Sequence, residues 1–400
     1  MLKKNYKNIK VRNAIFIGTL STLSYLACYF CRNILSVVSP EMIKSTDITV
    51  EFIGTLSTFN MLCYAGGQLM NGIVGDRLKA KYLVSVGLIL SGICSLFVPF
   101  SDFPMVMIGA YSLIGFFLSM LYAPLVKLIA ENTHPIYTTR CCLGLTFASL
   151  LGVPTAGVAA LFFNWENVFR LCGVILIMMG AICFFVLVLF EKRGIIKYKT
   201  VPKKQKQGGS IKVLVEHSII KFTFVSALTG IVRTSVVFWV PMYLSQYLGF
   251  STGTAATAFT VISFVQSASP YINNMIIYEH ILKRNMNKMV FLSFFLSTIS
   301  FSMMFLVHNP FINMVFLLLA LITANGASQM LWSVYCPSLK ETGMVSSATG
   351  YLNFVSYGAA GFANLVFANA VAQIGWGNLI LVWAMLMFVG VVIAIPGRKN

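Results

Sequence analysis

Residues 24–40, SYLACYFCRNILSVVSP, place one arginine inside a segment that is otherwise apolar enough to sit in lipid. An arginine at the centre of a membrane helix costs about 2.5–3.5 kcal/mol on insertion scales, so it is expected to face a protein interior or a watery cavity. Tyr25, Tyr29 and Arg32 follow an i, i+4, i+7 spacing and therefore share one helical face. Two hydroxyls and a forked cation on one face predict an anion-binding surface.

The same pairing of an arginine with a proline recurs about two hundred residues later. In RTSVVFWVPMYL, residues 233–244, Arg233 precedes Pro241 by eight positions, as Arg32 precedes Pro40. Many transporters are internally duplicated and bind substrate near the bilayer midplane, where the two halves meet. We therefore predict that the two arginines face each other across a cavity and present two positive charges to a small dianion. The alternative for either arginine is a place near a helix end, with the side chain reaching the lipid headgroups.

Composition sets the broad class of the protein. The chain of 400 residues is 58% hydrophobic and 10% charged, whereas about 25% of residues are charged in ordinary soluble domains. Hydropathy over windows of about 20 residues predicts an all-α membrane protein, with twelve transmembrane helices in two pseudo-symmetric six-helix bundles. We expect a first bundle over 1–190, a cytoplasmic linker over 191–217 and a second bundle over 218–400. The predicted segments are approximately 13–38, 50–74, 82–100, 104–129, 140–163, 167–190, 218–245, 252–278, 287–307, 310–335, 345–370 and 376–396.

The distribution of positive charge predicts the orientation in the membrane. Basic residues gather in the two termini and in alternate loops, and the opposite loops hold few of them. By the positive-inside rule, both termini are cytoplasmic, and we expect an integral protein of a bacterial cytoplasmic membrane. The net charge of +18 then reflects topology and attraction to anionic membrane lipid, and it does not indicate binding to nucleic acid.

A glycine-rich stretch closes the second predicted segment. In GQLMNGIVGDRLKAK, residues 67–81, Gly72 and Gly75 permit close approach of helices. Asp76 and the basic residues that begin with Arg77 can pair across a short cytoplasmic turn. This stretch resembles the loop signature of the major facilitator superfamily, and the six-plus-six layout fits that family. The resemblance implies a role in conformational switching for Gly72, Asp76 and Arg77, without contact to substrate.

A narrower resemblance is carried by the two arginine segments. The patterns Tyr-x3-Tyr-x2-Arg in the first segment and Arg-x5-Trp-x-Pro-x-Tyr-Leu in the seventh are similar to the organophosphate:phosphate antiporter family. That family includes the bacterial glycerol-3-phosphate and hexose-6-phosphate carriers, in which the two arginines bind the phosphoryl group. The resemblance implies this role for Arg32 and Arg233, and it implies substrate contact for Tyr25, Tyr29 and, in the eleventh segment, Tyr357.

Other candidate substrate contacts either differ from the residues of the glycerol-3-phosphate carrier or have a second possible role. Gln68 stands where the glycerol-3-phosphate carrier has a lysine, and Gly230 stands where it has a tyrosine one turn before the second arginine. Gln68 is therefore a candidate substrate contact with a changed chemistry. Lys127, near the end of the fourth segment, either contacts substrate in the cavity or reaches the cytoplasmic surface. Asn353 and Tyr357 lie one turn apart, where each can bond a neighbouring helix or the substrate.

These residues predict a secondary active transporter that exchanges a phosphorylated metabolite for inorganic phosphate by alternating access. No Asp or Glu falls in the middle of a predicted segment, and proton-coupled carriers commonly use such groups, so exchange of anions is favoured. Two alternatives stay open: a cation-coupled organic anion symporter, and a membrane sensor of phosphorylated sugars on the same fold. The sequence holds no recognisable catalytic set, so we expect no enzyme, cofactor or metal. We expect a monomer whose partners are an anionic substrate, inorganic phosphate and membrane lipid.

Overall fold

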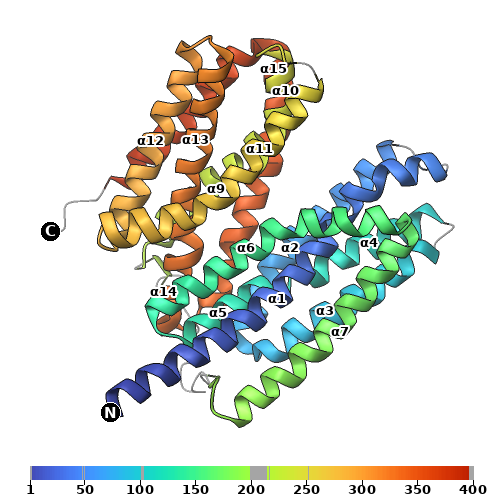
Figure 1. Cartoon of the computed structure of the whole chain (residues 1–400), viewed down its shortest axis with the longest axis vertical. Helices are drawn as coiled ribbons and strands as arrows, with labels where there is room; N and C mark the ends of the chain where they lie inside the picture. Colours follow the sequence, from blue (N-terminus) through green and yellow to red (C-terminus); the bar gives the residue numbers. More distant parts are fainter. Residues whose placement is uncertain are drawn as a thin grey trace. The chain divides into compact units, whose positions relative to one another are not determined.

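The computed structural model describes residues 2–46, 48, 50–100, 103–198, 214–215, 217–250 and 252–395, and no strand occurs among them (Figure 1). Three of the short segments, η2, η3 and η4, are π-helical. In chain order the helices are α1 Leu2–Ser45, α2 Val50–Arg77, α3 Ala80–Phe97, η1 Val98–Phe100, α4 Pro104–Leu118, α5 Tyr122–Asn132, α6 Pro135–Phe162, α7 Trp165–Lys192, α9 Ile219–Gly230, η2 Ile231–Val236, α10 Val237–Gln246, α11 Thr252–Tyr271, η3 Ile272–Ile281, α12 Met286–Leu306, α13 Pro310–Met330, η4 Leu331–Tyr335, α14 Cys336–Ser338, η5 Leu339–Thr342 and α15 Val345–Ala394.

The predicted all-α membrane fold is confirmed, but the count of twelve spans is not matched. Among the described residues, nine helices are long and apolar enough to cross a membrane. The nine do not include α2, the α11–η3 segment or the first part of α15. In α2, polar residues interrupt the apolar sequence, among them Asn60, Gln68 and Asn71. A hydropathy threshold alone therefore undercounts helices that carry polar contacts.

The helix α15 contains a break at Gly375, where φ is 72° and ψ is 172°. A positive φ of this size is readily adopted by glycine and rarely by other residues. The break falls between the predicted segments 345–370 and 376–396. Two predicted helices therefore follow each other here with almost no loop.

The chain divides into two compact units. Unit 1 comprises Met1–Leu214 together with Cys336–Phe354, and unit 2 comprises Val215–Tyr335 together with Val355–Asn400. The predicted boundaries at 190 and 218 stay a prediction. Most of the predicted linker, residues 199–213 and 216, lies outside the described residues.

In unit 1, α1 packs along α6 and α7, α3 packs along α4 and α7, and α2 packs along α4 (Figure 1). Small residues at these interfaces bring the helix backbones close together, as is common in membranes. Between α3 and α7, a Cβ atom on Gly92 would lie 2.7 Å from the carbonyl oxygen of Gly173. A Cβ atom on Gly173 would lie 2.6 Å from Cγ of Leu96. The α3–α7 interface therefore requires glycine at both positions.

The end of α7 and the residues that follow it also belong to the packing of unit 1. Glu191 accepts hydrogen bonds from the Nζ atoms of Lys79 and Lys81, each at 2.6 Å. Ile196 is buried, and its N–H bonds back to the carbonyl of Phe190 at 3.3 Å. The start of the predicted linker is thus attached to the end of the bundle where α3 begins.

In unit 2, α12 packs along α13, and α9 and α11 also contact α13 (Figure 1). Asn313 ties the end of α12 to α10. Its Nδ2 donates to the carbonyls of Met304 at 2.7 Å and Val307 at 2.8 Å, and its Oδ1 accepts from the hydroxyl of Tyr243. The last carbonyls of a helix have no hydrogen-bond partner within the helix. Asn313 acts as the donor to two carbonyls at the end of α12. Tyr243, a member of the seventh-segment sequence pattern, is therefore a buried structural residue.

We expect Gly173→Ala to lower the thermal unfolding midpoint of the purified protein by a few degrees. The added methyl group has no room beside Leu96 and Gly92, and overpacking typically costs about 1–3 kcal/mol. Gly109→Ala on α4 is the matched control, because no atom lies within 4 Å of a Cβ there. In a helix this control change is stabilising by up to about 1 kcal/mol. Equal midpoints for the two variants, measured by tryptophan fluorescence in detergent, would contradict a glycine-dependent α3–α7 interface.

Candidate functional site

Arg32 lies on α1 with its guanidinium close to two tyrosine rings. Its Cζ atom stands 4.1 Å from the ring centroid of Tyr64 on α2 and 5.0 Å from that of Tyr29. Its Nη1 atom donates to the hydroxyl of Tyr29 at 3.4 Å. A cation over an aromatic face gains about 0.5–2 kcal/mol, with the larger values in desolvated surroundings. The tyrosines therefore orient a guanidinium that is half-buried.

The structure brings together the three residues of the predicted face of α1. The rings of Tyr25 and Tyr29 meet edge to face at 5.0 Å, and Tyr29 contacts Arg32. Tyr25 is buried and also contacts the ring of Tyr122, at the start of α5, at 5.2 Å. Sequence reasoning missed Tyr64 and Tyr122. For Tyr64 a signal was present, because it lies one turn before Gln68 and shares its helical face.

Arg233 lies in the π-helical segment η2 of unit 2. Its Cζ atom stands 5.8 Å from the ring centroid of Tyr357 on α15, so two residues that are predicted separately as substrate contacts lie side by side. Gly230, directly before η2, allows α9 to approach α15, since a Cβ atom there would lie 2.9 Å from Cα of Ser356. π-Helical turns are rare and occur frequently at functional sites. Gly230 thus has a packing role beside Arg233.

Gln68 is fully buried on α2, and only part of its amide is paired. Its Oε1 accepts a hydrogen bond from Nδ2 of Asn353 at 3.3 Å. Its Nε2 has no hydrogen-bond partner among the residues that the structure describes. A buried donor without a partner costs about 1–3 kcal/mol. This amide is therefore able to donate to an oxygen atom of a ligand.

Asp76, the penultimate residue of α2, caps the N-terminus of α15. Its Oδ1 accepts from the N–H of Ser346 at 2.9 Å, and its Oδ2 accepts from the N–H of Ser347 at 2.8 Å. The first four N–H groups of a helix lack intrahelical partners, and the positive end of the helix dipole favours a carboxylate. One side chain therefore satisfies two of these four groups, although it lies about 270 positions away in the sequence.

Glycines allow this contact between α2 and α15 inside unit 1. A Cβ atom on Gly72 would lie 2.9 Å from Cα of Gly350, and one on Gly350 would lie 2.7 Å from Cα of Gly72. A Cβ atom on Gly75 would collide with the side chain of Ser346. The Gly-x-x-Gly-Asp spacing of the predicted switching stretch is thus the spacing that brings the Asp76 carboxylate to a helix N-terminus.

Lys127, on α5, belongs to the same cluster. Its Nζ donates to the carbonyls of Gly75 at 3.1 Å and Asp76 at 2.8 Å, and it stands 3.8 Å from Oδ1 of Asp76. A cation at the C-terminal end of a helix complements the negative end of its dipole. The predicted contact of Lys127 with substrate stays a prediction. Arg77 is exposed at the end of α2.

The remaining expectations about the site are of two kinds. Arg32 belongs to unit 1 and Arg233 to unit 2, and their predicted approach across a cavity stays a prediction. Within the described ranges, no three or more His, Cys, Asp or Glu side chains are grouped so as to hold a metal ion. The arrangement found here consists of oriented cations, hydroxyls and amides, which bind anions through hydrogen bonds.

The sequence matches a known family and several curated proteins. The family model described as Major Facilitator Superfamily matches residues 21–364. The chain is 25% identical over 264 residues to "Membrane sensor protein UhpC" of Escherichia coli (strain K12), covering 60% of this chain and 59% of that protein. It is 24% identical over 190 residues to "Probable hexose phosphate transport protein" of Chlamydia trachomatis serovar D, covering 46% and 40%. It is 26% identical over 191 residues to "Glucose-6-phosphate exchanger SLC37A2" of Xenopus laevis, covering 40% and 36%. The matched stretches span less than two thirds of each relative.

Solved structures with the same arrangement of helices are also found. The proton:xylose symporter XylE matches with a TM-score of 0.70 and 12% identity, covering 96% of this chain and 95% of that chain. The human organic anion transporter MFSD10 matches with a TM-score of 0.69 and 12% identity, covering 96% and 99%. At this level of identity the likeness shows the fold alone.

We expect Asp76→Asn to speed hydrogen exchange of the amides of Ser346 and Ser347 about fivefold. Loss of an N-terminal capping interaction costs about 1 kcal/mol, and the asparagine keeps only one acceptor oxygen and no charge. Exchange is measured by mass spectrometry on the peptide that contains the first turn of α15. Glu191→Gln is the control, because Glu191 bonds Lys79 and Lys81 and not α15. Unchanged exchange in Asp76→Asn would show that the carboxylate does not cap this helix in solution.

Proposed function

The chain belongs to the Major Facilitator Superfamily, and from that premise we propose that it is a secondary active transporter that exchanges a phosphorylated metabolite for inorganic phosphate. The observation that carries the proposal is the guanidinium of Arg32, oriented by Tyr29 and Tyr64 inside an apolar bundle. The names of two relatives, a hexose phosphate transport protein and a glucose-6-phosphate exchanger, support a sugar phosphate as the metabolite.

The geometry around Arg32 suits a phosphate group. A phosphate monoester carries about −1.5 to −2 charges near neutral pH and three strong acceptor oxygens. The guanidinium carries five N–H donors in a planar fork, and its Nη1 atom donates to the hydroxyl of Tyr29. A fork of this kind can form two parallel hydrogen bonds with a phosphate, which is the bidentate contact that favours arginine over lysine.

Arg233 is the second arginine of this proposed pair, which we call the two-arginine clamp. Tyr357 lies against its guanidinium as Tyr29 does against Arg32. Gln68 adds a neutral donor, because its Nε2 is buried without a partner among the described residues. A bound phosphate or sugar oxygen at that position would remove the cost of the unpaired donor. The bound anion itself neutralises the clamp, so exchange needs no separate proton-carrying group.

The cluster of Asp76, Lys127 and the first turn of α15 is the proposed switching element. Two charge-assisted hydrogen bonds hold the start of α15 on the end of α2. Transporters change access by moving one packed element against another, and such contacts break and reform as discrete states. We place this element and both chain termini on the cytoplasmic side of the membrane, as the distribution of basic residues predicts.

A membrane sensor of phosphorylated sugars is the second candidate, and the likeness to UhpC favours it. A sensor and an exchanger would bind the same anion and differ in flux. Proteoliposomes loaded with inorganic phosphate distinguish them when labelled glucose 6-phosphate is supplied outside. Uptake that depends on internal phosphate supports the exchanger. Binding without uptake supports the sensor, and uptake that requires a cation gradient supports an organic anion symporter.

We expect Arg32→Lys and Arg233→Lys each to lower phosphate exchange at least thirtyfold, although both keep the positive charge. Lysine lacks the planar fork, and losing one partner of a desolvated charge pair costs about 2–5 kcal/mol. Tyr29→Phe should cost about fivefold, because it removes one hydroxyl contact worth about 1 kcal/mol. The measurement is exchange of labelled phosphate in proteoliposomes at matched protein content.

The control for these variants is Arg170→Lys. Arg170 is exposed on α7 and bonds Asn167 at 2.9 Å, so this change should leave the exchange rate normal. A near-normal rate and affinity in either Arg32→Lys or Arg233→Lys would exclude the two-arginine clamp. The organic anion symporter would then be the better reading.

We expect Asp76→Asn to slow exchange while the affinity for phosphate stays within a few fold of normal. The substitution weakens the contact between α2 and α15 and leaves Arg32 and its tyrosines unchanged. Affinity is measured by equilibrium binding of labelled phosphate and rate by exchange. A large loss of binding, with normal exchange of whatever still binds, would contradict a switching role.

A further inference from the structure

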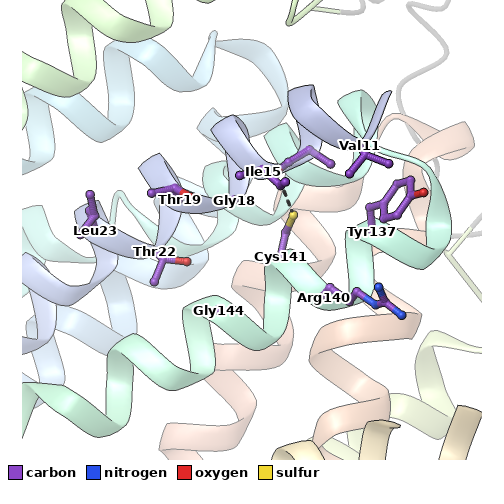
Figure 2. A pocket seen from close by; sticks show the side chains of 11 residues that line it. Val11, Ile15, Gly18, Thr19, Thr22, Leu23, Tyr137, Arg140, Cys141 and Gly144 are labelled. Atoms are coloured by element: carbon purple, nitrogen blue, oxygen red, sulfur yellow. Dashed lines mark hydrogen bonds between the residues drawn. The ribbon is translucent and has the colours of Figure 1, made fainter. Parts of the chain in front are cut away.

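A groove runs between α1 and α6 on unit 1, apart from the residues assigned above (Figure 2). Its volume is about 440 Å³. The side chains that line it come from α1 between Val11 and Leu23 and from α6 between Tyr137 and Gly144. Figure 2 shows Tyr137 and Arg140 at one end of the groove and Leu23 at the other.

Small residues hold the two helices together along the floor of the groove. A Cβ atom on Gly18 would lie 2.8 Å from Sγ of Cys141, and one on Gly144 would collide with the side chain of Thr22. The thiol of Cys141 donates to the carbonyl of Ala14 at 3.4 Å, the dashed line in Figure 2. We call this line of contacts the α1–α6 seam. Because the helices already touch there, they cannot close the groove by moving together.

The charged side chain of the groove lies at one end of it. Tyr137 and Arg140 lie in the first two turns of α6, and Arg140 is exposed. The rest of the lining is uncharged, and its walls include Ile15 and Leu23, which are 58% and 48% exposed, with Thr19 and Thr22 between them. A cation and a phenol at one end of an uncharged, mostly apolar groove match a ligand with an anionic head and a hydrocarbon tail.

The length of the groove fits one leaflet of a bilayer. From Val11 to Leu23 the helix rises about 18 Å at 1.5 Å per residue, and half of the roughly 30 Å hydrocarbon core is about 15 Å. The apolar spans of both helices begin at this end, at Val11 and at Pro135. Tyr137 and Arg140 therefore lie where headgroups meet hydrocarbon, a level at which tyrosine and arginine are favoured.

The groove and Arg32 lie at different levels along α1. Leu23 is the last residue of α1 that lines the groove, and Arg32 follows it by nine residues, about 14 Å of helix. Arg32 is therefore not part of the groove.

We propose that this groove binds one anionic phospholipid, with its headgroup phosphate on Arg140 and an acyl chain along Ile15 and Leu23. Charge complementarity supports an anionic headgroup. Arg12, which directly follows Val11, is exposed, and the whole chain carries a net charge of +18. By the orientation proposed above, this end of both helices faces the cytoplasmic leaflet, whose anionic lipids attract basic residues. The lipid site does not depend on which solute the protein carries.

Native mass spectrometry of the full-length protein, released from detergent with added phosphatidylglycerol or phosphatidylcholine, tests the proposal. Wild type should retain phosphatidylglycerol in preference to phosphatidylcholine. Arg140→Ala should lower retention of phosphatidylglycerol about fivefold, the factor that corresponds to about 1 kcal/mol for one basic residue at an anionic surface. Thr19→Trp, which fills the groove from an exposed position, should lower retention of both lipids. Arg170→Ala, the matched charge control on α7, should change neither.

Three results would overturn the lipid site. Equal losses in Arg140→Ala and Arg170→Ala would mean that the total charge, and not the groove, attracts the lipid. Full retention in Thr19→Trp would mean that the lipid binds elsewhere. Displacement of phosphatidylglycerol by millimolar inorganic phosphate or glucose 6-phosphate would assign the groove to the solute. None of these measurements requires transport. A failed exchange assay would therefore count against the proposed function and not against the lipid site.

Discussion

A guanidinium inside an apolar helix is the constraint on which the first bundle depends. Removing Arg32 from water is costly, and the structure offsets this cost with ring faces and a hydroxyl, whereas a carboxylate would cancel the charge. Tyr64 and Tyr29 stabilise the cation through their quadrupoles. In the proposed exchanger, this positive charge would attract an anion in surroundings of low dielectric, where the interaction is strong. Tyr25 and Tyr122 extend this aromatic support behind Tyr29.

Close helix contacts at glycine residues explain how the few polar groups of this molecule reach one another. In unit 1, Gly72 and Gly350 bring α2 and α15 close enough for the carboxylate of Asp76 to meet two backbone N–H groups. In unit 2, Gly230 brings α9 against α15 beside Arg233. Along α1 and α6, glycines hold the helices in contact and leave a groove at their side. In lipid, helix contacts gain little from the hydrophobic effect, so close packing and hydrogen bonds decide which helices associate.

Features that depend on one helix were predictable from the sequence, and features that depend on two were not. The row of Tyr25, Tyr29 and Arg32 follows from helical periodicity alone, and the break at Gly375 follows from the gap between two hydropathy segments. The placement of Tyr64 over Arg32 depends on how α2 packs beside α1, and sequence spacing does not contain that information. The same holds for Lys127, whose ammonium meets the end of α2 through a tertiary contact. The twelve-helix expectation exceeds the nine apolar helices among the described residues, because polar contact residues lower the hydropathy of helices such as α2.

In the proposed site, Gln68 is a neutral side chain beside two cations, and it would contribute to selection among phosphate esters. Arginine forks recognise the phosphate group whatever is attached to it, so selection among phosphate esters falls to neutral neighbours. A lysine at position 68 would add a charge and favour a more negative ligand, whereas the glutamine offers two N–H donors of no net charge. Its Oε1 already accepts a hydrogen bond from Asn353, one turn before Tyr357. The N–H donors on Nε2 can pair with a phosphate oxygen or with a sugar hydroxyl, and either contact relieves the same buried, unpaired group. In the proposed exchanger, discrimination by such a group would depend on the geometry of the ligand's oxygen atoms more than on the ligand's charge.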